Sequence, residues 1–223
     1  MSSPVPQVVV RGEAYLLVEP ELADVGVTVR TRARDRDTAL ERCAARQAEV
    51  MAVVTAAGRA VEVVETVGVS VHLEVNDRRA PGEPVAAVHT RLVLGRTDAV
   101  GDVVVALGRL DDVAVDGPHW RLRPNSPAVE RARLEAVADA VTRARHYAAA
   151  FGAELTGLLG ISDAGLSDSG FPVAGAMTSM ARFEGAPQLD LTPARQEVHG
   201  VVEVRFTMSE PDSSQWNGEV FRA

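Results

Sequence analysis

The side chains whose types and spacing come closest to a metal site are His72, Glu74 and His89. They lie in two β-rich runs, residues 61–75 and 85–94, separated by NDRRAPGEP, whose Asn, Asp, Pro and Gly are typical of a hairpin loop. A loop centred between the Ala and the first Pro of that segment would place His72 opposite His89, with Glu74 next along the same face. Two imidazoles and a carboxylate at cross-strand spacing can bind a transition metal or titrate near neutral pH. The alternative is a solvated polar sheet face, because a slip of one residue destroys the pairing.

A second group of polar side chains alternates along one predicted strand. His119, Arg121 and Arg123 are separated by Trp120 and Leu122, so one face of the strand is cationic. A small anionic ligand could bind there. The alternative is that these arginines pair with carboxylates on a neighbouring helix, which the net negative charge of the chain favours.

Sequence motifs of common enzyme classes are missing. There is no G-x-S-x-G, G-x-G-x-x-G, Walker loop or H-E-x-x-H, and the absence of lysine excludes Schiff-base and P-loop lysine chemistry. The single cysteine, Cys43, falls near the inner face of a predicted helix, which favours a packed thiol over a nucleophile. Asp111 and Asp112 are adjacent and favour a turn. We therefore expect no catalytic residues and no cofactor.

Length and composition indicate a globular protein. The chain has 223 residues, 46% of them hydrophobic, and 23 basic against 31 acidic residues give a net charge of 23 − 31 = −8. This charge argues against nucleic acid as the main partner. The beginning, MSSPVPQVVVRGEAYLL, has no basic segment and no apolar stretch long enough for a signal peptide or a membrane span, so we expect a cytoplasmic protein. We expect one domain over residues 1–223, with a core at 5–208 and a tail at 209–223.

A long alanine-rich helix is the clearest element of the sequence, at about residues 124–155. Small or apolar residues recur in it at i, i+3, i+4 and i+7, which predicts one buried stripe. Asn125 or Ser126 can cap its start, Pro127 suits the first turn, and Gly152 can end it.

The order of the other elements predicts an α+β fold. Strands are expected at residues 5–19, 25–33, 61–75, 85–94 and 113–123, and helices at 35–57 and 97–108. From residue 25 onward this order is the split βαβ arrangement, an antiparallel sheet with helices packed on it. Later strands, from residue 158 and at 197–208, are expected to complete the same sheet.

The segment 162–196 is rich in Gly, Ser, Pro and Ala and is much longer than an ordinary loop. Its apolar stretch FPVAGAMTSMARFEG has no clear period. This suits an arm that contacts a neighbouring subunit, or a lid over a ligand, and the alternative is a mobile loop. The candidate subunit contacts in it are Phe171, Met177, Met180 and Phe183.

Several phrases in order resemble the SIMPL-domain family, a family of unknown function that includes bacterial periplasmic immunogenic proteins. They are VVVRGEA, VGVTV after Pro20 and Glu21, DTALERCAARQAEVMAVVTAAG, AVHTRLVL, LGRLDDVAVDGPHWRL with the long helix, and VEVRFTM. The similarity spans roughly residues 7–208. The chain departs from the family pattern at Ala14 and Ala194, where the family usually has glycine. The resemblance implies an α+β fold and a tendency to form large ring-like or channel-like assemblies, and it implies no established catalytic residues.

Three functions are compatible with these observations. The first is a noncatalytic SIMPL-like protein that self-assembles into a homo-oligomer, through exposed strand edges or the long segment, in a scaffold or interaction role. The second is a small-ligand or metal-binding protein, possibly an enzyme, that uses the two-histidine face with residues 162–196 as a lid. The third is an adaptor that binds another protein through the same segment.

Overall fold

The computed structural model describes residues 5–75, 81–163, 189 and 191–212 of the chain. The chain divides into two compact units, which we call the three-stranded unit and the four-stranded unit after their sheets. The three-stranded unit comprises Met1–Val18, Asn125–Thr178 and Glu197–Ala223, and the four-stranded unit comprises Glu19–Pro124 and Ser179–Gln196.

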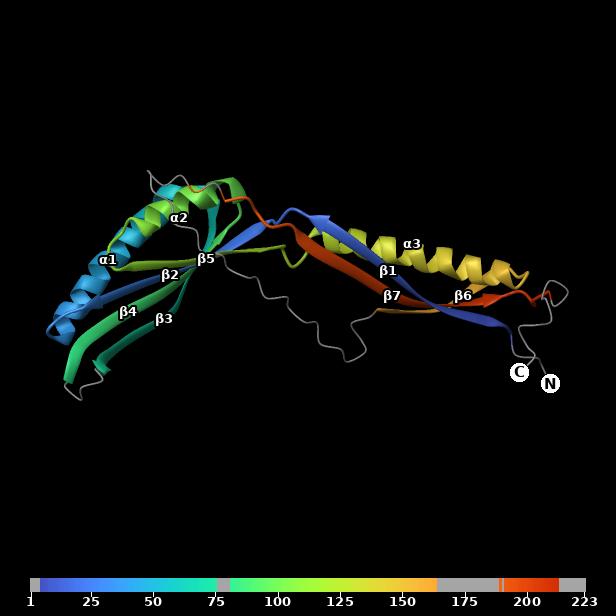
Figure 1. Ribbon diagram of the computed structural model, residues 1–223, viewed down its shortest axis with the longest axis horizontal. Helices are drawn as coiled ribbons and strands as arrows, with labels where there is room; N and C mark the ends of the chain where they lie inside the picture. The colour runs from blue at the N-terminus through green and yellow to red at the C-terminus, as the bar shows by residue number, and fades with distance from the viewer. Residues whose placement is uncertain (1–4, 76–80, 164–188, 190, 213–223) are drawn as a thin grey trace. The chain divides into compact units, whose positions relative to one another are not determined.

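The four-stranded unit has the split βαβ arrangement that the sequence predicts. Its main elements are β2 (Leu22–Arg32), α1 (Arg36–Ala57), β3 (Val61–Val75), β4 (Pro81–Leu94), α2 (Val100–Gly108) and β5 (Val113–Arg121), with short 3₁₀ turns at Gly58–Ala60 and Thr97–Ala99. The strand order is β3-β4-β2-β5, and each neighbouring pair is antiparallel. Both helices lie on the same sheet, α1 over β2 and β4 and α2 over β5 (Figure 1).

Helix α1 is positioned by local sequence signals and by its buried face. Asp35 caps its start by accepting a hydrogen bond of 2.8 Å from the Thr38 N–H, and Gly58 follows its end with φ of 54°. Its buried residues pack on alternate residues of β2, which makes one core cluster. That cluster includes Val25, Val27, Val29, Cys43, Val50, Val54, Leu92 and Leu107.

The three-stranded unit consists of β1 (Gln7–Val18), α3 (Pro127–Ala150), β6 (Leu155–Asp163) and β7 (Gln196–Met208). The order in its sheet is β1-β7-β6. Strands β6 and β7 are antiparallel, and the Met208 N–H at the end of β7 donates to the Pro6 carbonyl at 3.0 Å, just before β1. The prediction that the late strands complete the first sheet is therefore wrong: they pair with each other and with the first strand in a sheet of their own.

Helix α3 lies close against its sheet because its buried face consists of alanines and the sheet has glycine at two points of close approach (Figure 1). The predicted stripe is confirmed: its buried residues are Ala132, Ala136, Ala140, Ala144 and Ala148. A Cβ on Gly12 of β1 would collide with the backbone of Ala136 and Ala140, and one on Gly200 of β7 with the backbone of Ala132. Ser126 caps the helix and Gly152, with φ of 62°, follows its end, as expected.

The α+β class is thus confirmed, whereas the single domain stays a prediction. No helix in the described ranges is both long and apolar enough to cross a membrane. The cytoplasmic location stays a prediction as well. The candidate contacts Phe171, Met177, Met180 and Phe183 lie outside the described residues.

Candidate functional site

The three residues of the predicted metal site lie on the four-stranded sheet but not together. His72 is opposite Val85, and His89 is opposite Gly68. The two histidines share a face of the sheet, yet four positions, roughly 13 Å along the strands, separate them. The predicted hairpin register is wrong because β3 and β4 pair about a centre two residues nearer the N-terminus than predicted.

His89 and Glu74 each have other partners. The His89 ring contacts the Thr28 hydroxyl at 3.0 Å. The Glu74 carboxylate accepts hydrogen bonds from Arg30 at 2.9 Å and Arg32 at 2.8 Å. The described residues contain no group of three or more His, Cys, Asp or Glu side chains that could hold a metal ion. Metal binding by His72, His89 and Glu74 stays a prediction that this register does not favour.

The cationic strand is neutralised by carboxylates. Arg121 contacts the Asp24 carboxylate, which also accepts a hydrogen bond of 2.9 Å from Arg91. Arg123 forms two hydrogen bonds with Glu62, at 2.6 and 2.9 Å, and these hold the pKa of the Glu62 carboxyl below its ordinary value. This confirms the interpretation that the arginines pair with carboxylates. The partners lie on β2 and β3 rather than on a helix.

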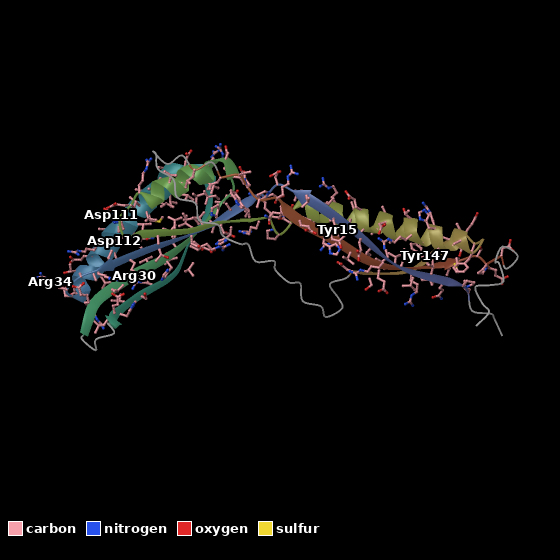
Figure 2. The ribbon with its side chains drawn as sticks, in the orientation of Figure 1. Tyr15, Arg30, Arg34, Asp111, Asp112 and Tyr147 are labelled. Carbon is pink, nitrogen blue, oxygen red and sulfur yellow. The ribbon has the colours of Figure 1, made fainter. Side chains whose placement is uncertain are left out.

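Two further sequence predictions hold in the four-stranded unit. Cys43 is buried in the core, and burial raises the pKa of its thiol, which keeps it protonated and poorly nucleophilic. Asp111 and Asp112 form the turn before β5 (Figure 2).

A hollow of about 720 Å³ near the start of α2 is lined by Asp98 and Asp102. Asp98 is held by Arg96, whose hydrogen bonds lower the pKa of the Asp98 carboxyl.

A largely uncharged and exposed edge is formed by β6, the outer strand of the three-stranded sheet. Every residue after Leu155 is exposed. Leu158, Leu159 and Ile161 are exposed at 56%, 50% and 59%, respectively. One side of β6 pairs with β7, and no other strand lies on its outer side within the described residues. Its outer backbone N–H and C=O groups are therefore available to a further strand.

Helix α3 leaves most of β6 uncovered. The core beneath the helix is built mainly from β1 and β7, and Leu155 joins it from β6. A groove of about 630 Å³ remains between the end of α3 and β6. It is lined by Val141, Arg145, Ala148, Ala149, Ala153, Glu154, Leu155, Thr156, Gly157, Leu158 and Phe206.

The opposite face of this sheet is mixed in character. Tyr15 lies on β1 (Figure 2), and its ring stacks on His199 of β7, with 4.2 Å between ring centroids and 10° between planes. The outer strand β1 carries an ion pair in its middle, between Arg11 and Glu13 at 2.7 Å. The two edges of the sheet thus differ in charge: β1 carries Arg11 and Glu13 among exposed apolar side chains, whereas β6 has no charge before Asp163. The sequence analysis named exposed strand edges as subunit contacts but did not single out β6. The signal that could have identified this strand is the uncharged run LTGLLGIS at residues 155–162.

The fold and the surface define an α+β protein with two antiparallel sheets and an exposed apolar edge. The SIMPL family model, described as a protein of unknown function (DUF541), matches residues 8–206. The chain therefore belongs to the SIMPL family, as the resemblance in the sequence predicts. A comparison with curated proteins finds no match.

Proposed function

We propose that this SIMPL-family protein is noncatalytic and self-assembles into a homo-oligomer through β6, in a scaffold or interaction role. The observation that carries the proposal is the exposed edge of β6 with three large apolar side chains at half exposure or more. Soluble proteins usually protect a sheet edge with charges, proline, bulges or a covering element. A second copy would supply the cover that the described chain lacks.

The sequence of β6 supports this reading. Residues 155–162 contain no charge and no proline, and the single charge, Asp163, is the last residue of the strand. Two irregularities in its pairing with β7 are the only edge protection within the strand. Strand β1, by contrast, has the Arg11–Glu13 pair at its centre, where a further strand would have to cover both charges.

The apolar side chains alone give a modest association. Full burial of a Leu or Ile side chain stabilises by about 1.5–3 kcal/mol. Because these three side chains are about half exposed, each contributes roughly 1 kcal/mol, or roughly 6 kcal/mol for two copies. Association costs about 4–15 kcal/mol in lost translational and rotational freedom. Strand-to-strand hydrogen bonds must supply the rest, so we expect assembly that depends on concentration.

The noncatalytic part of the proposal is supported by how the charged groups of the four-stranded unit are used. Asp24, Glu62 and Glu74 are each held by arginine, which leaves them poorly placed to act as acids or bases. The ring-like or channel-like form that the resemblance implies stays a prediction, as does an adaptor role.

Light scattering after size-exclusion chromatography tests the proposal. We compare the unaltered chain, with a monomer mass of 23.7 kDa, with an Ile161→Lys variant. The matched control is Leu134→Lys, because Leu134 of α3 is also exposed, at 64%. We expect the unaltered chain and the control to assemble and Ile161→Lys to shift strongly toward monomer. An unaltered chain that is monomeric at every concentration would refute self-assembly, and an assembled Ile161→Lys would refute β6 as the contact.

A further inference from the structure

We propose that two copies pair β6 with β6 in antiparallel fashion about a two-fold axis, with Leu158 of each copy opposite Ile161 of the other. This inference rests on the proposed self-assembly and specifies its contact. It follows from the faces of β6, from its length and from its own sequence.

The register with β7 fixes which face each residue of β6 occupies. Leu158 is opposite Phe206 and Ile161 is opposite Val204. Phe206 and Val204 are buried beneath α3, so Leu158 and Ile161 lie on the helix-side face of the sheet. The pairing shifts between Leu158 and Gly160, which explains why residues three apart share a face.

The other face of β6 follows from the same register. Gly157, Gly160 and Ser162 are opposite Thr207, Arg205 and Glu203, which alternate with the buried residues of β7. These three residues therefore lie on the open face of the sheet, away from α3.

Matching of faces restricts the symmetric registers. If Leu158 is opposite Ile161, then Gly157 is opposite Ser162, and each pair joins residues of the same face. A slip of one residue would place Leu158 opposite Gly160, which lies on the other face, and is excluded. The accepted register sets exposed apolar side chains against each other, beside Phe206 of one copy and Val204 of the other.

A second register also matches faces, with Leu158 opposite Leu158. The residue numbers of paired residues in two antiparallel strands add up to a constant. In that register Ser162 of one copy would therefore be opposite Glu154 of the other, which precedes β6. That register pairs only residues 155–161, seven of the nine residues of β6, and leaves Ser162 and Asp163 outside the strand-to-strand pairing. The Leu158–Ile161 register pairs residues 156–163, eight of the nine, and therefore forms the longer ladder of backbone hydrogen bonds.

The character of β6 favours a second copy as the occupant. Self-pairing sets the uncharged residues 157–162 of one copy against the same uncharged residues of the other, so that no charge is covered in the contact. A two-fold pairing is closed, so both copies use the same edge and no further edge of this kind is left open. The pair would form a continuous six-stranded sheet from two three-stranded sheets.

Disulfide trapping tests the register. We introduce Leu158→Cys and Ile161→Cys together in a Cys43→Ala background, since Cys43 is the single cysteine of the chain. Opposite residues in antiparallel strands have Cα atoms about 4.5–5.5 Å apart, within disulfide reach. Positions 158 and 161 of one chain are roughly 10 Å apart and cannot form a bond. We expect the oxidised double variant to run as a covalent dimer and each single variant to stay largely uncrosslinked.

The outcomes separate this inference from the proposed function. An assembled chain whose double variant gives no covalent dimer overturns the register and leaves self-assembly standing. A covalent dimer of Leu158→Cys alone overturns it in favour of the register centred on Leu158. A monomeric chain overturns both proposals. Gly157→Cys with Ser162→Cys repeats the test on the open face, and a covalent dimer of that pair supports the same register.

Discussion

Replacing Gly12 by alanine tests the close contact between β1 and α3. A Cβ on Gly12 would collide with the backbone oxygen of Ala136 and would lie within 2.7 Å of the Ala140 Cβ. The neighbouring atoms are mostly helix backbone rather than the flexible end of a side chain, so the helix itself must move. We therefore expect Gly12→Ala to destabilise the three-stranded unit.

The magnitude follows from two opposing effects. Overpacking a close contact costs about 1–3 kcal/mol. Alanine also restricts the unfolded chain, which stabilises by about 0.4–1 kcal/mol where the backbone conformation is compatible. The expected net loss is about 1–2 kcal/mol, which in a chain of this size lowers Tm by roughly 2–8 °C.

Thermal and urea unfolding followed by circular dichroism measure the effect. The matched control is Gly68→Ala on β3, because a Cβ there would meet nothing within 4 Å. We expect the control to change the free energy of unfolding by less than about 1 kcal/mol, with a tendency to stabilise. Equal effects of the two substitutions would refute the argument that close approach to α3 requires glycine at position 12.

Three other substitutions test different parts of the account. Asp139 accepts a 2.9 Å hydrogen bond from the Glu13 N–H, which holds the pKa of the Asp139 carboxyl below its ordinary value. The stability that this carboxylate contributes is therefore present above the ordinary aspartate pKa and is lost as pH falls through the lower pKa of the folded state. Asp139→Asn should accordingly flatten the fall in Tm below about pH 5. An unchanged dependence of Tm on pH would contradict this. Leu107→Ala, at a fully buried site, should cost about 2–5 kcal/mol in urea unfolding, and a loss under 1 kcal/mol would contradict the assigned core. Asp35→Ala removes the side-chain oxygen that accepts from the Thr38 N–H and should lower the unfolding midpoint. Asp35→Asn keeps an acceptor oxygen and should lower the midpoint much less.

Much of the fold could be predicted from the sequence because periodicity reports directly on burial. The alanine stripe of α3 repeats every four residues, and each of those alanines is buried. The split βαβ order follows from the sequence of elements alone. Periodicity does not show which strand pairs with which. Alternation shows which side chains of β7 face a core, but not which sheet contains the strand. This is why the two separate sheets could not be predicted.

The predicted pairing of His72 with His89 was wrong for a related reason. Hairpin register depends on the centre of the loop and on bulges, and the sequence around residues 76–84 permits several centres. The predicted pair His72 and His89 is displaced by four positions in the structure. Because four is an even number and side chains alternate with a period of two, the prediction that both lie on one face survived while their contact did not.

Hydrogen–deuterium exchange at several protein concentrations tests the central claim most directly. The account predicts that outward amides of Leu155–Asp163 exchange slowly where the chain is assembled and quickly on dilution, because a second strand binds them only in the assembly. The charged edge strand Gln7–Val18 serves as the internal control and should exchange alike at all concentrations. Protection of β1 without protection of β6, or exchange in β6 that is independent of concentration in an assembled protein, would contradict assembly through this edge.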